Sequence, residues 1–326
     1  MTQLQKILAG VLALQVVLAA VMFWPRATGE TAVGPLFADL TVASITAVTI
    51  ADNEGVQVEL ARQGTGWVLA NGGDYPVDSA KIEPVLEKLA ALQAGRLVAR
   101  TPTSYARLRV ADNEFVRRVD LQTAAGEAYT LYLGSSPTAQ ATHMRRADQT
   151  ETYLVGGVNV WEVSQLATSW IDTAYISLPL ETITAVTLQN SQGDFTLTRT
   201  PEATWTLADL GEGEIVSQNN LNALLGRITN LRLVWPLGVA DQPAYGLANP
   251  QAMVTLTAVA DNASRSYTLL VGAQNRDNGN YIVKWSDADH YVEVSAFAVE
   301  GLVGNGRDDF LEIPPTPAAI DDDTGG

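Results

Sequence analysis

The sequence predicts an α+β fold: two tandem homologous domains of mostly antiparallel sheet with packed helices, preceded by one N-terminal transmembrane helix. Three observations lead to this prediction. The chain opens with a long apolar run, a six-residue strand pattern recurs in its second half, and each copy groups alternating strands before and after one amphipathic helix. Strands grouped in this way, with turns of hairpin length between them, are typical of antiparallel α+β domains.

Residues 1–26 are predicted to form a membrane anchor. The run Ile7–Trp24 contains no charged residue and one polar residue, Gln15. A helix of this length rises about 27 Å, close to the thickness of the hydrocarbon core. A cleaved signal peptide is the alternative, although its apolar region would normally be shorter, about 7–15 residues. The flanking charges favour a cytoplasmic N-terminus, so we expect a single-pass protein of the cell membrane with an extracytoplasmic body.

The two ends of the body are interpreted as loosely structured. Residues 27–43 are predicted to be a tether, from which Leu36 and Phe37 are expected to dock on the body. Residues 314–326 are predicted to be a disordered acidic tail, because this composition buries too little apolar surface to order itself. Its three consecutive aspartates, Asp321–Asp323, are expected to be solvated and not to bind a metal.

The body is predicted to be a duplication, with α+β repeats at 44–178 and 179–313. The strand pattern Ile45–Ile50 recurs as Ile183–Leu188, at an offset of 183 − 45 = 138. One chance hexapeptide would carry little weight, but the offset holds along each copy. It relates Trp67 to Trp205, Leu69 to Leu207, Ser79 to Ser217, Leu86 to Leu224, Tyr129 to Tyr267, Gly134 to Gly272 and Tyr153 to Tyr291.

Each repeat is expected to begin with three alternating strands and to place four more after its helix. The first three are expected at 45–52, 56–62 and 66–70, and again at 183–190, 194–200 and 204–208. Alternation of apolar and polar residues, with Asn, Gly, Ser and Asp between the runs, is the signal for strands and hairpins. The later strands are expected at 117–123, 129–135, 143–148 and 152–157, and at 252–259, 267–273, 281–287 and 290–295. Short helical patterns at 160–170 and 296–303 are expected to close the two repeats.

One helix is predicted in each repeat. Ser79 and Ser217 stand at matched positions and are predicted to be N-caps. Pro84 is compatible only with a first helical turn, so the first helix is expected to start one or two residues later. The apolar stripes that predict the helices are Ile82, Val85, Leu86, Leu89 and Leu92, and Leu221, Leu224, Leu225, Ile228 and Leu231.

Composition excludes several classes of function. The chain of 326 residues carries 20 Lys and Arg against 36 Asp and Glu, a formal net charge of -16. Nucleic-acid binding relies on clustered basic residues, so we expect no nucleic-acid partner. The absence of cysteine excludes disulfides, thiolate metal sites and thiol nucleophiles. The sequence also lacks the phosphate-binding G-x-x-x-x-G-K-[ST] motif, so any ATP hydrolysis that drives transport is expected to belong to another chain.

No catalytic, cofactor or metal site is predicted. The two histidines, His143 and His290, are not matched by the offset and lack a H-E-x-x-H context, so both are interpreted as ordinary strand residues. Asp287–Asp289 and Asp277–Asn280 resemble fragments of calcium loops, but neither has the full spacing of ligands, and turn chemistry is the preferred interpretation. The six tryptophans of the body are candidates for a binding platform. Burial is expected for Trp67 and Trp205, whereas an exposed pair among Trp161, Trp170, Trp235 and Trp285 would suit a sugar or a protein partner.

The sequence combines the N-terminal apolar span, the I-T-A-V-T-[IL] strand, the W-x-L-A strand, the capped helix and the run Tyr245–Pro250. With these features the body resembles a bacterial family of unknown function, DUF4340. The resemblance covers about residues 36–314, and its motifs are packing and turn patterns that imply no chemistry. The first copy departs from the pattern: Tyr105–Leu108 lacks the Gly and Pro of Tyr245–Pro250, so this turn is expected to be built differently in the two copies. Relatives are commonly encoded beside ABC-2-type export permeases and gliding-motility-type auxiliary proteins, which implies a membrane-anchored accessory subunit.

Three functions are therefore considered. The first is a non-enzymatic, membrane-anchored extracytoplasmic accessory or adaptor of an ABC-type envelope transport complex, with integral-membrane or auxiliary transporter subunits as partners. The alternative is an extracytoplasmic module that binds a glycan or a peptide in the cleft between the two repeats. The third, ranked last, is a hydrolase that uses paired carboxylates.

Overall fold

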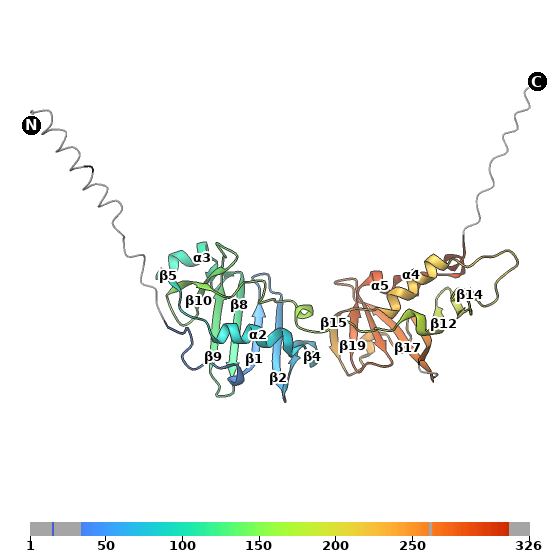
Figure 1. The fold of residues 1–326 in the computed structure, drawn as a ribbon, viewed down its shortest axis with the longest axis horizontal. Coiled ribbons are helices and arrows are strands. Elements are labelled where there is room, and N and C mark those ends of the chain that lie inside the picture. The colour runs from blue at the N-terminus through green and yellow to red at the C-terminus, as the bar shows by residue number, and fades with distance from the viewer. Residues whose placement is uncertain (1–14, 16–33, 261–262, 313–326) are drawn as a thin grey trace, which may run out of the picture. The chain divides into compact units, whose positions relative to one another are not determined.

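The computed structural model describes residues 15, 34–260 and 263–312 (Figure 1). In these residues it has two large antiparallel sheets and four helices, which confirms the predicted α+β class. Among the residues that the structure describes, no helix has both the length and the apolar character needed to cross a bilayer. Apart from Gln15, the predicted anchor lies outside the described residues, as do residues 27–33 of the predicted tether and the predicted tail at 314–326.

The chain divides into two compact units. Residues 1–57 and 83–164 belong to the first unit, and residues 58–82 and 165–326 belong to the second. Both units are built around buried aliphatic and aromatic side chains. Sequence-distant segments therefore share a unit, so that residues 58–82 are grouped with the second half of the chain.

The first large sheet has the strand order β4-β3-β2-β1-β8-β9-β10-β11-β5. Along β8, Val119 and Leu121 are fully buried whereas Arg118 and Gln122 reach solvent, the alternation expected when one face covers a core. A two-stranded sheet, β6 with β7, accompanies it. The strands are β1 (Ile45–Ala51), β2 (Gln57–Gln63), β3 (Gly66–Leu69), β4 (Tyr75–Val77), β5 (Arg96–Ala99), β6 (Val110–Ala111), β7 (Glu114–Phe115), β8 (Arg117–Thr123), β9 (Ala128–Leu133), β10 (Ala141–Arg146) and β11 (Thr152–Gly156).

The second large sheet has the order β14-β13-β12-β16-β17-β18-β19-β15. Within the described residues, this order repeats that of the first sheet strand for strand, with no counterpart of β4. Val254 and Leu256 on β16 are fully buried, like Val119 and Leu121 on β8. The strands are β12 (Ile183–Asn190), β13 (Gly193–Arg199), β14 (Trp205–Leu207), β15 (Leu233–Gly238), β16 (Ala252–Ala260), β17 (Ala263–Gln274), β18 (Tyr281–Trp285) and β19 (Tyr291–Val294).

Helices α2 (Ser79–Ala90) and α4 (Gln218–Thr229) occupy the predicted places. Ser217 is the N-cap of α4, as predicted, and its hydroxyl accepts from the Asn220 amide at 3.5 Å. Two predictions for α2 are wrong. The carboxylate of Asp78, and not Ser79, accepts from the first turn, 3.0 Å from the Ala80 amide. The helix also starts before Pro84, which lies inside it. The carbonyl that Pro84 leaves without a donor belongs to Ala80, which is exposed, so water can satisfy it.

The two closing patterns fold differently. In the second sheet's half, α5 (Ala296–Gly304) forms as predicted and lies beside α4 (Figure 1). The pattern at 160–170 yields only a 3-10 turn, Ala167–Ser169, so the helix expected there is wrong. The Glu162 side chain accepts from the Asn159 amide at 3.0 Å and pairs with Lys88, but the turn at residues 160–162 is not continued into a helix.

Each sheet is entered through a short segment that pairs with the chain just before its edge strand. At the first sheet, the Leu36 amide donates to Leu92 O at 2.8 Å and the Ala94 amide donates to Gly34 O at 2.8 Å. At the second sheet, the Tyr175 amide donates to Leu231 O at 2.9 Å and the Leu233 amide donates to Thr173 O at 2.9 Å. The bridges Pro35 with Gln93 and Ala174 with Arg232 complete the match. Leu36 and Phe37 are buried, as expected, so residues 34–37 are built into the fold.

The segments that leave the two sheets are also alike. The Asp78 amide donates to Trp170 O at 2.8 Å, and the Ser217 amide donates to Phe310 O at 2.8 Å. Trp170 and Phe310 are both buried. Trp170, which has no partner at the offset of 138, therefore has a structural counterpart 140 positions later (310 − 170 = 140).

A turn that the sequence predicts to be built differently in the two copies is indeed different. The first contains the short helix α3 (Tyr105–Leu108), which ends at Arg109 with φ 57°. The second is the 3-10 turn Pro243–Tyr245, which ends at Gly246 with φ 69°. Both place a carbonyl against a matched glycine, since a Cβ on Gly134 would lie 2.1 Å from Leu108 O and one on Gly272 would lie 2.1 Å from Tyr245 O.

Candidate functional site

His143 is half-buried on β10. Its Nδ1 lies 2.8 Å from Ser135 O and 3.0 Å from Ser135 Oγ. Burial lowers the pKa of the imidazole, an effect that the bond to Ser135 opposes and the charges of Arg96 and Arg107 reinforce. A neutral ring that donates to a neighbouring carbonyl ties two strand segments together. The structure thus gives His143 a structural partner on its own sheet.

His290 belongs to a cavity of about 350 Å³ in the second unit. Three segments supply its walls: the start of β4, the segment that enters the second sheet, and the turn between β18 and β19. Of its lining residues, sequence reasoning had singled out only His290 and the Asp287–Asp289 turn. The lining residues are Tyr75, Pro76, Asp172, Ala174, Tyr175, Ala288, Asp289 and His290.

Tyr175 holds the turn in place. Its hydroxyl donates to His290 O at 2.7 Å and accepts from the Trp285 amide at 2.9 Å. The residue is buried, which raises the pKa of its phenol well above the ordinary value. A phenol that stays protonated and makes both bonds acts here as a rigid brace for one wall of the cavity.

Tyr75 and His290 are in contact through their rings. Their rings pack edge to face, with centroids 4.9 Å apart, and His290 Nε2 lies 3.2 Å from Gly73 O. Burial raises the pKa of the Tyr75 phenol, and the nearby Asp172 carboxylate adds to the effect. In the part of the chain that the structure describes, no hydroxyl is recorded in a hydrogen bond with the His290 ring. The contacts of the His290 ring are thus with a backbone carbonyl and with the Tyr75 ring.

Lys284 is the cation next to this cavity, although it does not line it. Its ammonium donates to Ala288 O and, at 2.8 Å, to Asp289 O, and it lies 5.0 Å from the centre of the Tyr291 ring. Burial lowers the pKa of Lys284, and the charge of Asp289 opposes the shift. The turn between β18 and β19 therefore already holds one ammonium group on its backbone carbonyls.

The two calcium-loop fragments have other partners in the described residues. Asn275, Asn278 and Asn280 direct their side-chain amides at the buried carboxylate of Glu293, at 2.8, 2.9 and 3.3 Å. Asp287 pairs with Arg265 at 2.5 Å. Among the described residues, no group of three or more His, Asp or Glu side chains is arranged to hold a metal ion. The asparagines of one fragment and Asp287 of the other therefore have protein partners.

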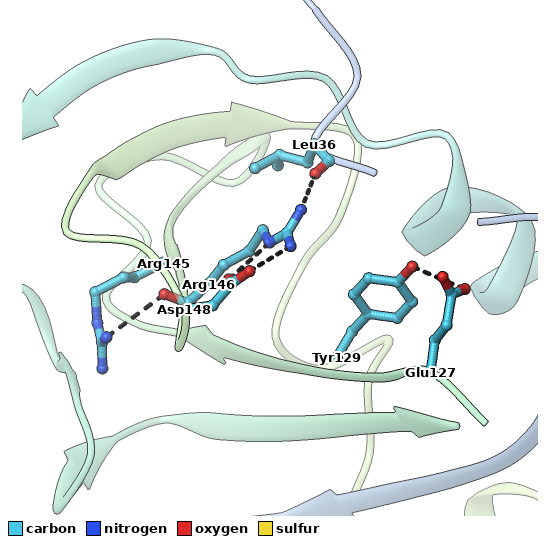
Figure 2. Close-up of polar contacts among 6 residues, drawn as sticks. All are labelled: Leu36, Glu127, Tyr129, Arg145, Arg146 and Asp148. Carbon is cyan, nitrogen blue, oxygen red and sulfur yellow. Dashed lines mark hydrogen bonds and ion pairs between the residues drawn. The ribbon is translucent and has the colours of Figure 1, made fainter. Parts of the chain in front are cut away.

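Arg146 joins the entry segment to the first sheet (Figure 2). It donates to Leu36 O at 2.5 Å and forms two bonds to Asp148, at 2.9 and 2.6 Å. Its guanidinium also lies 5.0 Å from the centre of the Phe37 ring and 5.6 Å from that of Tyr129. These contacts, which we call the Arg146 clamp, attach residues 36–37 to β9 and β10.

The tryptophans supply little exposed surface. Trp67, Trp205, Trp170 and Trp285 are buried, so the expectation for the matched pair Trp67 and Trp205 is confirmed. Trp161 is 65% exposed and Trp235 is intermediate. Of the four tryptophans considered for an exposed pair, only Trp161 is exposed in the described residues, so the pair that would suit a sugar is not formed.

A second hollow of about 400 Å³ lies between α4 and α5. Beside it, Arg227 stacks on Phe297 with the guanidinium 4.0 Å from the ring centre, and Phe297 is 63% exposed. The lining residues are Asn220, Ala223, Leu224, Arg227, Glu300, Gly301, Asn305 and Asp309. The charged residues of this lining are of both signs: Arg227 is basic, and Glu300 and Asp309 are acidic.

Comparisons with known proteins give one match. The family model described as "Domain of unknown function (DUF4340)" matches residues 67–234. These are 168 of the 326 residues (234 − 67 + 1 = 168), slightly more than half of the chain. No curated protein and no solved structure matches.

Proposed function

This chain belongs to the DUF4340 family, and we propose that it is a non-enzymatic, membrane-anchored extracytoplasmic accessory or adaptor of an ABC-type envelope transport complex. In this proposal residues 7–24 form the transmembrane helix, and the two sheets belong to tandem homologous domains. The shared strand order and the matched entry and exit segments support the duplication. Integral-membrane or auxiliary transporter subunits would be the partners.

The Arg146 clamp is the observation that carries the proposal. It builds the chain into the first sheet from residue 34 on, so only residues 27–33 would separate the body from an anchor that ends at residue 26. Seven residues (33 − 27 + 1 = 7) span at most about 25 Å in any conformation. A body held so near the bilayer suits an adaptor that contacts integral-membrane partners, more than a binding protein that must reach into the periplasm or medium.

Crosslinking in native membranes tests the accessory role. The full chain is crosslinked at its natural abundance, purified and analysed by mass spectrometry, and we expect an ABC-type permease or its auxiliary subunit in the same complex. The variant Arg146→Ala, which releases the entry segment, should lower this recovery several-fold. Lys284→Ala is the matched control, because Lys284 stands 138 positions later and does not contact the entry segment of the first sheet. Recovery of the chain alone would contradict the proposal.

A second candidate function is the binding of a glycan or a peptide. The cavity lined by Tyr75, Tyr175 and His290 favours it, because aromatic side chains with a few converging polar groups are typical of ligand sites. Glycan arrays and thermal-shift screens test this role. A melting temperature that no ligand changes would remove it without affecting the accessory role.

A further inference from the structure

We propose that the cavity in the second unit binds a primary ammonium group on an aliphatic chain, such as the side chain of a lysine in an extended peptide. Three features of the cavity indicate this ligand: its charge, its aromatic lining residues and its size. The inference rests on the second candidate function, ligand binding, and is independent of the accessory role.

The charge of the lining is negative. Asp172 and Asp289 are its carboxylates, both exposed, and no lysine or arginine is among the lining residues. The only bond recorded for the Asp172 carboxylate is from the Ala174 amide, at 2.9 Å, and no cation in the described residues forms an ion pair with either aspartate. An anionic ligand would be repelled here, whereas an ammonium group would find the Asp172 carboxylate without an ion-pair partner and the Asp289 carboxylate with only the nearby charge of Lys284.

Lys284 shows that the turn attracts an ammonium group. Its own ammonium is bound to Ala288 O and Asp289 O, and Lys284 is not among the lining residues, so its hydrogen bonds leave the carboxylate of Asp289 for a second cation. Two positive charges would then lie near the same turn. Lys284 therefore weakens binding somewhat but does not occupy the site.

The aromatic walls suit the same ligand. Tyr75 and Tyr175 are among the lining residues, and aromatic side chains attract cations. The bonds of Tyr175 to His290 O and the Trp285 amide already fix its ring, so ligand binding does not have to pay the entropy cost of ordering it. The Tyr75 hydroxyl has no recorded partner among the described residues and can accept one of the three hydrogens of an ammonium group.

The size of the cavity points to a side chain. A volume of about 350 Å³ lies at the lower end of the range for ligand pockets, roughly 300–1,000 Å³. This space fits a single lysine side chain with its adjoining backbone. The lining contains no tryptophan, the side chain on which a sugar ring would stack best.

Calorimetric titration of the full chain in detergent tests the inference. The probes are the tripeptide acetyl-Gly-Lys-Gly-amide, the same peptide with its lysine acetylated, and a neutral hexose oligosaccharide. We expect the lysine peptide to bind, its affinity to fall with ionic strength, and the acetylated peptide to bind at least about tenfold more weakly, because it lacks the charge.

Asp289→Asn should weaken the lysine peptide about five- to tenfold, a modest loss because the carboxylate is exposed. Asp277→Asn, on the exposed turn between β17 and β18, is the matched control and should leave the affinity unchanged. Equal binding of both peptides, or an unchanged affinity in Asp289→Asn, overturns the ammonium site. Binding of the oligosaccharide alone would overturn it while leaving ligand binding in place, and no binding of any probe would remove both.

Discussion

At two matched positions, the two sheets exchange a valine for a buried charge. On β10 the first sheet carries Arg145, and 138 positions later β18 carries Val283. On β11 the first sheet carries Val155, and at the same offset β19 carries Glu293. All four side chains are buried. The first sheet thus buries a cation and the second buries an anion, each at a place where the other sheet is apolar.

The two charges are balanced in different ways. Arg145 donates to Val110 O at 2.9 Å, pairs with Asp112 and lies 4.4 and 4.7 Å from the ring centres of Tyr105 and Tyr132. Glu293 is balanced by the neutral amides of three asparagines. One strand order is thus compatible with a buried cation or a buried anion, because the loops of the two sheets supply different partners for the charge. What the two sheets share is backbone geometry, and what differs is the loop chemistry.

The largest expected effect tests the shared geometry. Alanine at Gly134 or at Gly272 would place its Cβ 2.1 Å from a backbone carbonyl, which cannot move without shifting the turn. We expect each variant to lose about 3 kcal/mol or more of the free energy of unfolding. Hydrogen exchange during urea unfolding, read separately for the two sheets, measures this loss.

The control for this pair is Gly226→Ala on α4, where an added Cβ meets nothing within 4 Å. It should raise stability by about 0.5–1 kcal/mol, because alanine favours a helix over glycine. A tolerated alanine in one sheet only would mean that the two turns do not share their close contact.

A smaller effect is expected when each buried charge is replaced by the valine of the other sheet. Glu293→Val leaves the amides of Asn275, Asn278 and Asn280 without their carboxylate, and Arg145→Val leaves Val110 O without its donor. We expect each change to cost about 2 kcal/mol, since a buried polar group left unsatisfied costs about 1–3 kcal/mol. Denaturant unfolding of the single variants measures these costs. Glu293→Gln keeps one acceptor oxygen and should cost less, so an equal loss in Glu293→Gln and Glu293→Val would contradict this account.

Sequence periodicity was sufficient for the seven strands expected in each copy, the main helices and the matched buried tryptophans, whereas it missed the strands β4, β5, β6, β7 and β15. Their signal is the burial of every second residue in β8 and β16, and of one stripe in α4. The cap of α2 was missed because Asp78 and Ser79 are adjacent and both suit an N-cap. The buried charges Arg145 and Glu293 were missed for another reason. A pattern of apolar residues does not reveal which loop supplies the partners of a buried charge.

The entry segments and the cavity have no such signal. Residues 34–36 and residues 173–175 make matching backbone hydrogen bonds, each to the chain near the start of its own sheet's edge strand, although the two segments share no residue type. What they have in common is a buried pair of side chains, Leu36–Phe37 and Tyr175–Ile176. The cavity combines three segments distant in sequence, so Tyr75 and Asp172 could be placed there only by the fold.

The smallest expected effect uses the matched pair His143 and Tyr281. The folded state holds the pKa of His143 below its ordinary value of 6.5, so the unfolded chain binds the proton more readily. The resulting stability is fully present above about pH 6.5 and is lost as the pH falls through the folded pKa. The second sheet has Tyr281 at this position in place of an imidazole. We therefore expect the first sheet to lose stability between about pH 7 and pH 5, by well under 1 kcal/mol because solvent screens this half-buried ring. Unfolding of His143→Gln over the same range measures the difference, with His290→Gln as control. A pH slope that His143→Gln leaves unchanged would show that the ring is as easily protonated in the fold as in the unfolded chain.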